Sequence, residues 1–271
     1  MSGRMQGKIA IVTGGGSGMG RAGAEAFAAE GAAVVVADID GSKAERVVQT
    51  ISSAGGQARA ARVDVADSTQ VQALVAETVA AFGRIDVLYH CAADVHFINT
   101  QDRCLLDLPE ATWQRMLDIH LTGTFLCAKY VGRQMRAQGS GSMILTATVD
   151  ALIGTTGLDS YTAAKGGVVA LTRSLAAGVG AHGVRVNCVC PGFVATESQM
   201  DWLSAPAARQ MMEQLHILPV PGPEAIAPFI VYLASDESAY VTGGIYPIDS
   251  GYMAFKAKLD VMGLMQPQST G

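Results

Sequence analysis

Thr13-Gly-Gly-Gly-Ser-Gly-Met-Gly20 is the stretch that decides the fold, because of what stands on either side of it. A short apolar run, residues 8–13, leads into the glycines, and an alanine-rich run, residues 21–29, follows them. A glycine turn between a strand and a helix lets backbone amides approach a diphosphate, and the helix N-terminus adds partial positive charge. The stretch therefore predicts a dinucleotide site at the first turn of an α/β fold.

Apolar strands alternate with single helices along the rest of the chain. Strands buried on both faces read as continuous apolar runs, so this alternation predicts parallel pairing with helices on both sides of the sheet. Ser42, with Glu45 three residues on, predicts a capping box that starts a helix ending near residue 54. The expected strands are 8–13, 33–38, 58–63, 86–91, 142–146, 184–190 and 245–249, and the expected helices are 21–29, 42–54, 68–82, 113–138, 161–178 and 224–234.

The fold class that follows is α/β, a single-domain Rossmann-type doubly wound parallel sheet of about seven strands. No linker or shift in composition divides the series, so we expect one domain over residues 1–252 and a C-terminal extension over residues 253–271. The extension carries Phe255, Leu259, Met262 and Leu264, which expose much apolar surface if left in water. We expect it to pack on a neighbouring subunit or over a substrate lid, or to fold back on its own subunit.

The composition excludes several classes of protein. The formal net charge of −5 argues against nucleic acid or an anionic membrane as the main partner. No apolar run approaches the length of about 20 residues that spans a bilayer, and the N-terminal apolar run is too short for a signal peptide. We therefore expect a cytoplasmic protein with a small-molecule substrate.

The spacing of the cysteines does not fit a disulfide framework. Five are present, an odd number without regular spacing, and most lie in apolar segments. They predict buried thiols in a reducing compartment, and the histidines and cysteines show no metal-ligand spacing. We expect neither disulfides nor a metal site. The five are Cys91, Cys104, Cys127, Cys188 and Cys190.

Asp38 ends the second expected strand, eighteen residues past Gly20. A carboxylate at this point accepts hydrogen bonds from the adenosine ribose hydroxyls and repels a 2′-phosphate. No arginine or lysine adjoins Asp38 in the sequence or lies inside the glycine turn, so the pattern favours NAD over NADP. The alternative is a solvated aspartate that caps the next turn.

Tyr161-Thr-Ala-Ala-Lys165 places a phenol and an ammonium four residues apart, on one face of a helix. A tyrosine has an ordinary pKa near 10, too high for a base at neutral pH, and a neighbouring ammonium would stabilise the phenolate. The pair predicts proton transfer to or from a substrate oxygen. Without the glycine turn, it would be an ordinary tyrosine and lysine on a helix surface.

Taken together in order, these motifs resemble the short-chain dehydrogenase/reductase family over residues 6–252. Further matching features are Asp64-Val65 after the third strand, Asn187, Pro191-Gly192 and Thr196, and Asp249 with Gly251 near the end. The resemblance implies catalysis by Tyr161 and Lys165 and a cofactor site around the glycine turn. The implied cofactor-binding residues are Gly14, Ser17, Gly18, Met19, Asp38, Ile39, Asp64, Val65, Cys91, Ala92, Tyr161, Lys165, Pro191, Gly192, Val194 and Thr196.

Three departures from the family pattern bear on the chemistry. His90-Cys91-Ala92-Ala93 replaces the family's Asn-Asn-Ala-Gly, and Thr148 stands at the position of the catalytic serine, thirteen residues before Tyr161. His120 stands where the family has an asparagine that helps hold a proton-relay water. Threonine keeps the hydroxyl, and the His120 ring nitrogens would carry a relay that titrates near neutral pH. We expect a working set of Thr148, Tyr161, Lys165 and His120; the alternative is weakened or lost catalysis.

Two acidic residues in a loop, and a segment further along the chain, are candidates for contact with the substrate. Asp150 and Asp159 lie between Thr148 and Tyr161, where a carboxylate either binds a second substrate hydroxyl or is simply exposed to solvent. By the resemblance, residues 199–218 form a lid whose methionines and tryptophan suit an apolar or cyclic substrate. The alternative is that the same side chains pack in the core or in an interface.

The function expected from the resemblance is an NAD-dependent short-chain alcohol dehydrogenase/ketone reductase, favoured in the direction that oxidises a secondary alcohol. The alternatives are a 3-oxoacyl-type reductase and a catalytically attenuated dinucleotide-binding protein. Members of the family are commonly tetramers, so we expect a homotetramer built on the helices that begin near Trp113 and Tyr161.

Overall fold

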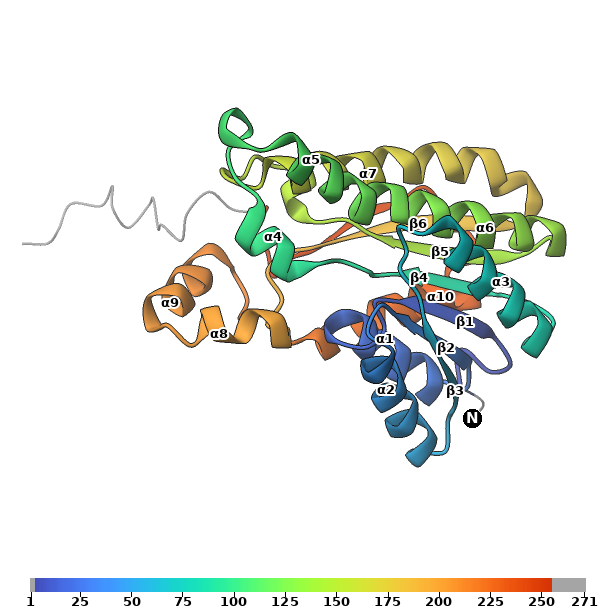
Figure 1. Cartoon of the computed structure of the whole chain (residues 1–271). Helices are drawn as coiled ribbons and strands as arrows, with labels where there is room; N and C mark the ends of the chain where they lie inside the picture. Colours follow the sequence, from blue (N-terminus) through green and yellow to red (C-terminus); the bar gives the residue numbers. More distant parts are fainter. Residues whose placement is uncertain (1–2, 255–271) are drawn as a thin grey trace, which may run out of the picture.

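Seven parallel strands form one sheet in the order β3-β2-β1-β4-β5-β6-β7. The computed structural model describes residues 3–254 (Figure 1). This topology confirms the Rossmann-type, doubly wound prediction. The strands are β1 (Ile9–Thr13), β2 (Ala33–Asp38), β3 (Gln57–Arg62), β4 (Val87–His90), β5 (Gly141–Thr146), β6 (Val184–Pro191) and β7 (Ile245–Ile248).

Helices cover both faces of the sheet (Figure 1). Helices α1, α2 and α10 pack over one face, and α3, α6 and α7 cover the other, with α5 against α7. The α-helices are α1 (Gly18–Ala29), α2 (Gly41–Ser53), α3 (Ser68–Phe82), α4 (Val95–Gln101), α5 (Glu110–Leu117), α6 (Gly123–Gln138), α7 (Asp159–Val179), α8 (Met200–Leu203), α9 (Pro206–Leu215) and α10 (Ala227–Ala234).

The strand sequences explain this burial. Every residue of β1, β2 and β4 is buried, as their continuous apolar runs predict for strands covered on both sides. Successive side chains alternate between two apolar cores, so Ile11 belongs to one core and Val12 to the other. The sheet is thereby fixed from both faces, and its carboxyl edge is a rigid base for a site.

Helix α2 starts differently from the sequence prediction. Its N-cap is Asp40, whose carboxylate accepts the backbone amides of Ser42 and Lys43. The predicted capping box at Ser42 and Glu45 is therefore wrong. Asp40 precedes Ser42 by two residues and is the stronger acceptor, since an ionised carboxylate also suits the positive end of the helix.

The predicted long helix 113–138 is interrupted. Helix α5 starts at Glu110 after Pro109, and a π-helical turn, Asp118–Thr122, separates it from α6. Such a turn inserts one extra residue into a helix and often occurs at functional sites. It carries His120, which sequence periodicity alone had placed in regular helix.

Strands β1 and β4 meet where the strand order reverses. Thr13 pairs with His90 in the register, and the Thr13 hydroxyl lies 2.9 Å from His90 Nδ1. Burial, with the Lys165 charge second, lowers the pKa of His90 to about 3, so this ring is neutral. Ligands of open α/β sheets bind in the crevice at the carboxyl ends of such strands. His90 therefore ties together the two strands that border this crevice.

The cysteine prediction holds only in part. Cys127, Cys188 and Cys190 are buried, but Cys91 is half-buried and Cys104 is exposed. All five are free thiols. Within residues 3–254, no helix is long and apolar enough to cross a membrane, and no group of three histidine, cysteine or acidic residues is placed to hold a metal.

The predictions for the C-terminal extension fall mostly outside the part of the chain that is described. Phe255, Leu259, Met262 and Leu264 all lie there. The division of the chain at residue 252 stays a prediction.

Candidate active site

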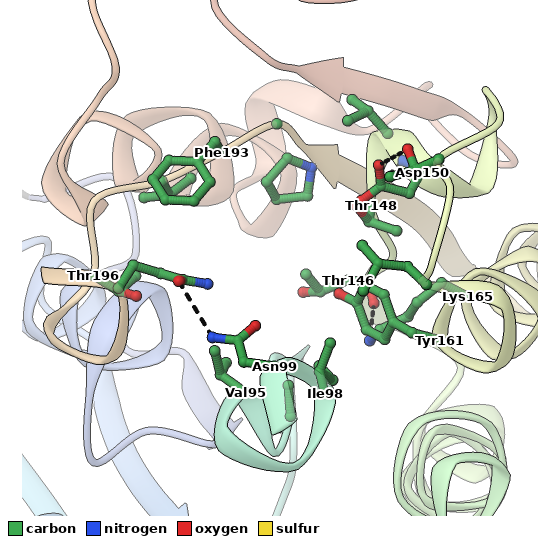
Figure 2. Close-up of a pocket in the computed structure, with 18 of the residues that line it drawn as sticks. Val95, Ile98, Asn99, Thr146, Thr148, Asp150, Tyr161, Lys165, Phe193 and Thr196 are labelled. Atoms are coloured by element: carbon green, nitrogen blue, oxygen red, sulfur yellow. Dashed lines mark hydrogen bonds between the residues drawn. The ribbon is translucent and has the colours of Figure 1, made fainter. Parts of the chain in front are cut away.

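A cavity of about 700 Å³ opens at the carboxyl end of the sheet. Helices α4, α8 and α9 lie at this end of the molecule (Figure 1). The lining includes Thr148, Asp150, Tyr161 and Lys165 (Figure 2). The lining also includes Thr146 of β5, and Gly192 and Phe193 from the loop after β6. Segments more than forty residues apart in the sequence therefore converge on one cavity.

Lys165 lies at the base of this cavity. Helix α7 carries Tyr161 and Lys165 one turn apart, and Lys165 Nζ donates to the backbone oxygen of Thr146 at 2.8 Å. The ammonium lies 5.8 Å from the centre of the Tyr161 ring. Only 2% of Lys165 is exposed, and burial lowers its pKa to about 8. The lysine is therefore fixed beneath the phenol, as the four-residue spacing predicts.

The Tyr161 phenol is more weakly acidic than the sequence suggested. Burial raises its pKa well above the ordinary value of 10, and the Asp150 carboxylate raises it further. The expectation that the neighbouring ammonium sets the acidity of Tyr161 is therefore wrong for the protein alone, because desolvation outweighs it.

Thr148 directs its hydroxyl to a carboxylate. Its Oγ1 donates to Asp150 Oδ2 at 2.8 Å and accepts the Asp150 backbone amide at 3.3 Å (Figure 2). The other carboxylate oxygen, Oδ1, accepts the Thr155 hydroxyl at 2.5 Å. Asp150 thus faces the cavity, whereas Asp159 accepts the Leu105 amide at 2.7 Å and is absent from the lining.

His120 lies behind Tyr161 rather than in the cavity lining. Its ring meets the Tyr161 ring edge to face, with centroids 5.3 Å apart. Both ring nitrogens are buried and have no hydrogen-bond partner among the described residues. Burial, with the Lys165 charge second, holds the pKa of His120 well below 6.5. The predicted titration near neutral pH is therefore wrong, and His120 is a neutral ring there.

Asp102 was missed by the sequence analysis. One of its carboxylate oxygens accepts the Ser160 hydroxyl at 2.7 Å, and the other accepts the Tyr161 amide at 2.9 Å. A carboxylate at this point satisfies free amides at the N-terminus of α7 and favours its positive end. Helix α4, which the sequence analysis did not predict, leads directly into Asp102. The only signal was Asp94 before an apolar stretch, where it caps α4.

The glycine turn forms a cradle that a dinucleotide diphosphate fits. Gly14 has φ +64°, and a side-chain carbon there would lie 2.7 Å from Ala92 Cα. Gly18 has φ +53° and opens α1, and its amide donates to a carboxylate oxygen of Glu197 at 2.9 Å. The amide at this helix N-terminus thus already binds an anionic oxygen, as a diphosphate site requires.

Asp38 stands beside this cradle. Its Oδ2 accepts the Gly16 amide at 2.9 Å, and its Oδ1 accepts the Asp40 amide. Arg62 is its register partner on β3, and Lys43 approaches Gly16 from α2. Basic side chains therefore lie near Asp38 in space. The sequence alone does not reveal this, because strand pairing and not chain adjacency brings Arg62 there.

The other predicted cofactor residues divide into those that line the cavity and those that lie outside its lining. Val65 packs under Gly123, Ala92 against Gly14, and Gly192 against Asp249. Ile39 is exposed, Ser17 occupies the N-cap position of α1 without a side-chain capping hydrogen bond, and Asp64 accepts the Ala66 amide. Those that line the cavity are Met19, Cys91, Pro191, Gly192, Val194 and Thr196.

The predicted lid region forms part of the cavity wall. Trp202 and Met212 line it, and Trp202 lies 5.4 Å from Phe193, centroid to centroid. Leu203 is buried, whereas Met211 and Leu215 are exposed. The region thus lines the cavity through Trp202 and Met212 and packs in the interior through Leu203, and its role as a lid over a substrate stays a prediction.

Comparison with known proteins identifies the family. The family profile described as enoyl-(acyl carrier protein) reductase matches residues 14–253. The short-chain reductase protein NovJ of Streptomyces niveus is 41% identical, over 91% of this chain and 94% of its own. The chain belongs to the short-chain dehydrogenase/reductase family. The resemblance drawn from the motifs is thereby confirmed.

Other short-chain dehydrogenase/reductase members extend this picture. Cis-4-hydroxycyclohexanecarboxylate dehydrogenase of Sinomonas cyclohexanicum is 39% identical, over 91% of this chain and 97% of its own. The crystal structure of a putative gluconate dehydrogenase from Agrobacterium tumefaciens matches with a TM-score of 0.87 at 27% identity, over 93% of this chain and 98% of that one. Membership and fold together imply an oxidoreductase that uses a nicotinamide dinucleotide.

Proposed function

We propose that this short-chain dehydrogenase/reductase is an NAD-dependent enzyme that interconverts a secondary alcohol and a ketone on an apolar or cyclic substrate. The observation that carries the proposal is the meeting of Thr148, Tyr161 and Lys165 in one cavity. A phenol, a hydroxyl and a buried ammonium at the mouth of a dinucleotide cradle suit proton transfer coupled to oxidation or reduction.

Each side chain has a separate part in this chemistry. Tyr161 exchanges a proton with the substrate oxygen, giving it in reduction and taking it in oxidation. Thr148 binds that oxygen. Lys165 lies beneath the phenol of Tyr161, and its positive charge favours the ionised form of that phenol. A nicotinamide dinucleotide held in the cradle would supply the hydride acceptor for oxidation and the hydride donor for reduction, while Tyr161 takes or gives the accompanying proton.

The cofactor would be held by groups on both sides of the crevice. Gly14, Gly18 and the α1 N-terminus would face the diphosphate, and Asp38 the adenosine ribose. The Asp38 carboxylate disfavours a 2′-phosphate, which supports NAD. Arg62 and Lys43 are positively charged and would attract a 2′-phosphate, so they oppose the preference for NAD. The preference therefore depends on the Asp38 carboxylate.

The cavity walls support a substrate with an apolar body. Ile98, Phe193, Trp202 and Met212 contribute broad apolar surface. The relative named cis-4-hydroxycyclohexanecarboxylate dehydrogenase supports a ring that bears an alcohol as the substrate body here, whereas the carboxylate in that name has no exposed cation to pair with in the described lining of this cavity.

The subunits, we infer, assemble as a homotetramer through the surfaces of α6 and α7. Phe125 on α6 is 44% exposed, with Lys129 lying 5.3 Å from its ring centre. Exposed aromatic side chains are enriched at subunit contact surfaces relative to the rest of a protein surface.

A turnover screen tests the proposed function. Purified protein is mixed with NAD and a set of cyclic and linear secondary alcohols, and reduced cofactor is followed by its absorbance, beside a calorimetric titration of NAD. We expect turnover that Tyr161→Phe abolishes. NAD binding without turnover of any alcohol or ketone would instead favour the catalytically attenuated alternative.

A further inference from the structure

The hydroxyl proton of Thr148 is already committed. It is donated to Asp150 Oδ2 at 2.8 Å, inside the cavity. A hydroxyl has one proton to give and two lone pairs with which to accept. While this bond stands, Thr148 only accepts from a substrate oxygen, although stabilising a carbonyl or a developing alkoxide requires a donor.

Asp150 is also the charged group that the cavity offers to a substrate. Three charged residues line it among the described residues: Asp102, Asp150 and Lys165. Asp102 binds the start of α7 through both oxygens, and Lys165 is buried and bonded to Thr146. Asp150 is half-buried and lines the cavity, with Oδ2 bound to the Thr148 hydroxyl and Oδ1 bound to the Thr155 hydroxyl.

This distribution of charge selects among substrates. The described lining has no exposed cation to pair with a carboxylate or phosphate of a substrate. A group near Asp150 is therefore favoured if it is neutral and donates a hydrogen bond. A hydroxyl meets this condition and an anion does not.

We propose that Asp150 is a substrate-specificity residue that binds a second hydroxyl on the carbon next to the reacting one, so that the preferred substrates are neutral vicinal diols, or the matching hydroxyketones, on an apolar body. This inference rests on the proposed function of the same cavity.

The geometry accounts for the preference. Thr148 Oγ1 and Asp150 Oδ2 lie 2.8 Å apart, about the distance between two hydroxyl oxygens on neighbouring carbons that can bond to each other. When the second hydroxyl donates to Asp150, it replaces Thr148 there. The Thr148 proton is then free to turn to the reacting oxygen. A substrate with one hydroxyl leaves the Thr148–Asp150 bond in place.

Paired substrates test this inference. Cyclohexanol and cis-1,2-cyclohexanediol share a ring and differ by the second hydroxyl. A hydrogen bond to a charged group supports a preference of about tenfold or more, so we expect the diol to exceed cyclohexanol by that factor in kcat/KM. In Asp150→Ala the ratio of the two kcat/KM values should fall close to one, because the diol loses its partner and the Thr148 proton is free with either substrate. Asp150→Asn, which keeps the shape and an acceptor oxygen, should give an intermediate ratio.

A binding measurement separates this inference from the proposed function. In Tyr161→Phe saturated with NAD, calorimetry reports the affinity for each alcohol without turnover. We expect tighter binding of the diol, lost on adding Asp150→Ala. Asp159→Asn is the matched control, because this loop carboxylate lies outside the cavity lining, and it should keep the wild-type ratio.

Two results would overturn the inference: equal affinity for the two alcohols, or a diol preference that survives Asp150→Ala. Failure of all alcohols to react, with the diol still bound through Asp150, would contradict the proposed function and support the binding role. Circular dichroism checks each variant, and Asp150→Asn decides the matter if Asp150→Ala does not fold.

Discussion

The carboxylate of Asp102 accepts the backbone amide of Tyr161 at 2.9 Å, so the segment after α4 holds the turn that presents the phenol. The same carboxylate accepts the amide and hydroxyl of Ser160, which is fully buried. A residue in a loop that precedes α5 thereby sets the position of Tyr161 relative to Lys165.

Replacing Asp102 should loosen this arrangement. Loss of a helix cap costs about 1 kcal/mol, within a range of about 0.5–2 kcal/mol. We expect Asp102→Ala to lower the free energy of unfolding by about that much and to lower kcat, while NAD affinity is unchanged. Denaturant unfolding, kinetics and calorimetry measure these three quantities. Asp107→Ala, at an exposed acid nearby, is the control and should change none of them.

Tyr161 and Thr148 should differ in which substitutions leave the enzyme active. Removal of a general acid/base costs about 100-fold or more in rate, so we expect Tyr161→Phe to lose at least that in kcat. Thr148→Ser keeps the hydroxyl and should stay active, whereas Thr148→Val keeps the shape and should lose most activity. Full activity in Tyr161→Phe or in Thr148→Val would refute the assignment.

Lys165 should make stability depend on pH. Burial lowers its pKa to about 8 from an ordinary 10.5, so between these values the unfolded chain holds a proton that the folded chain has released. The free energy of unfolding therefore rises with pH in this window. We expect wild type to gain about 2–3 kcal/mol between pH 7 and pH 10 relative to Lys165→Met. Parallel stability curves for the two proteins would contradict a buried charge at this position.

Cofactor choice should depend on Asp38. We expect NAD to bind at least about tenfold more tightly than NADP, which is about 1.4 kcal/mol. Asp38→Ala should narrow this gap by removing the repulsion while Arg62 and Lys43 remain nearby. Adding Arg62→Ala to that variant should widen the gap again. Calorimetric titrations with both cofactors measure it, and equal affinity in wild type would sink the proposal.

His120 should contribute no ionisation to catalysis near neutral pH. Burial keeps the pKa of this ring well below 6.5, so it is neutral throughout that range. We expect the dependence of kcat on pH between 6 and 8 to have the same shape in wild type and in His120→Asn. An inflection near pH 6.5 present only in wild type would show that the ring titrates.

The sequence was informative where the chemistry is local. The glycine turn, the Tyr161–Lys165 spacing and the continuous apolar strands each depend on neighbouring residues, and the structure has the predicted elements within a few residues. Arg62, Asp102 and the Thr148–Asp150 bond depend on parts of the chain brought together by folding. The neutrality of His120 and the raised pKa of Tyr161 depend on burial, which no spacing of residues reveals.

The pairing of β1 with β4 also bears on how the chain reaches this structure. Thr13 and His90 are 77 residues apart in sequence, with β2 and β3 formed between them. Contacts of such separation require closure of a long loop and slow the folding of parallel sheets, which in chains of this length commonly pass through intermediates. The dinucleotide crevice exists only after this pairing. We therefore expect the cofactor to leave unchanged the rate of every folding step that precedes the docking of β4. Its effect should appear instead as a slower unfolding reaction.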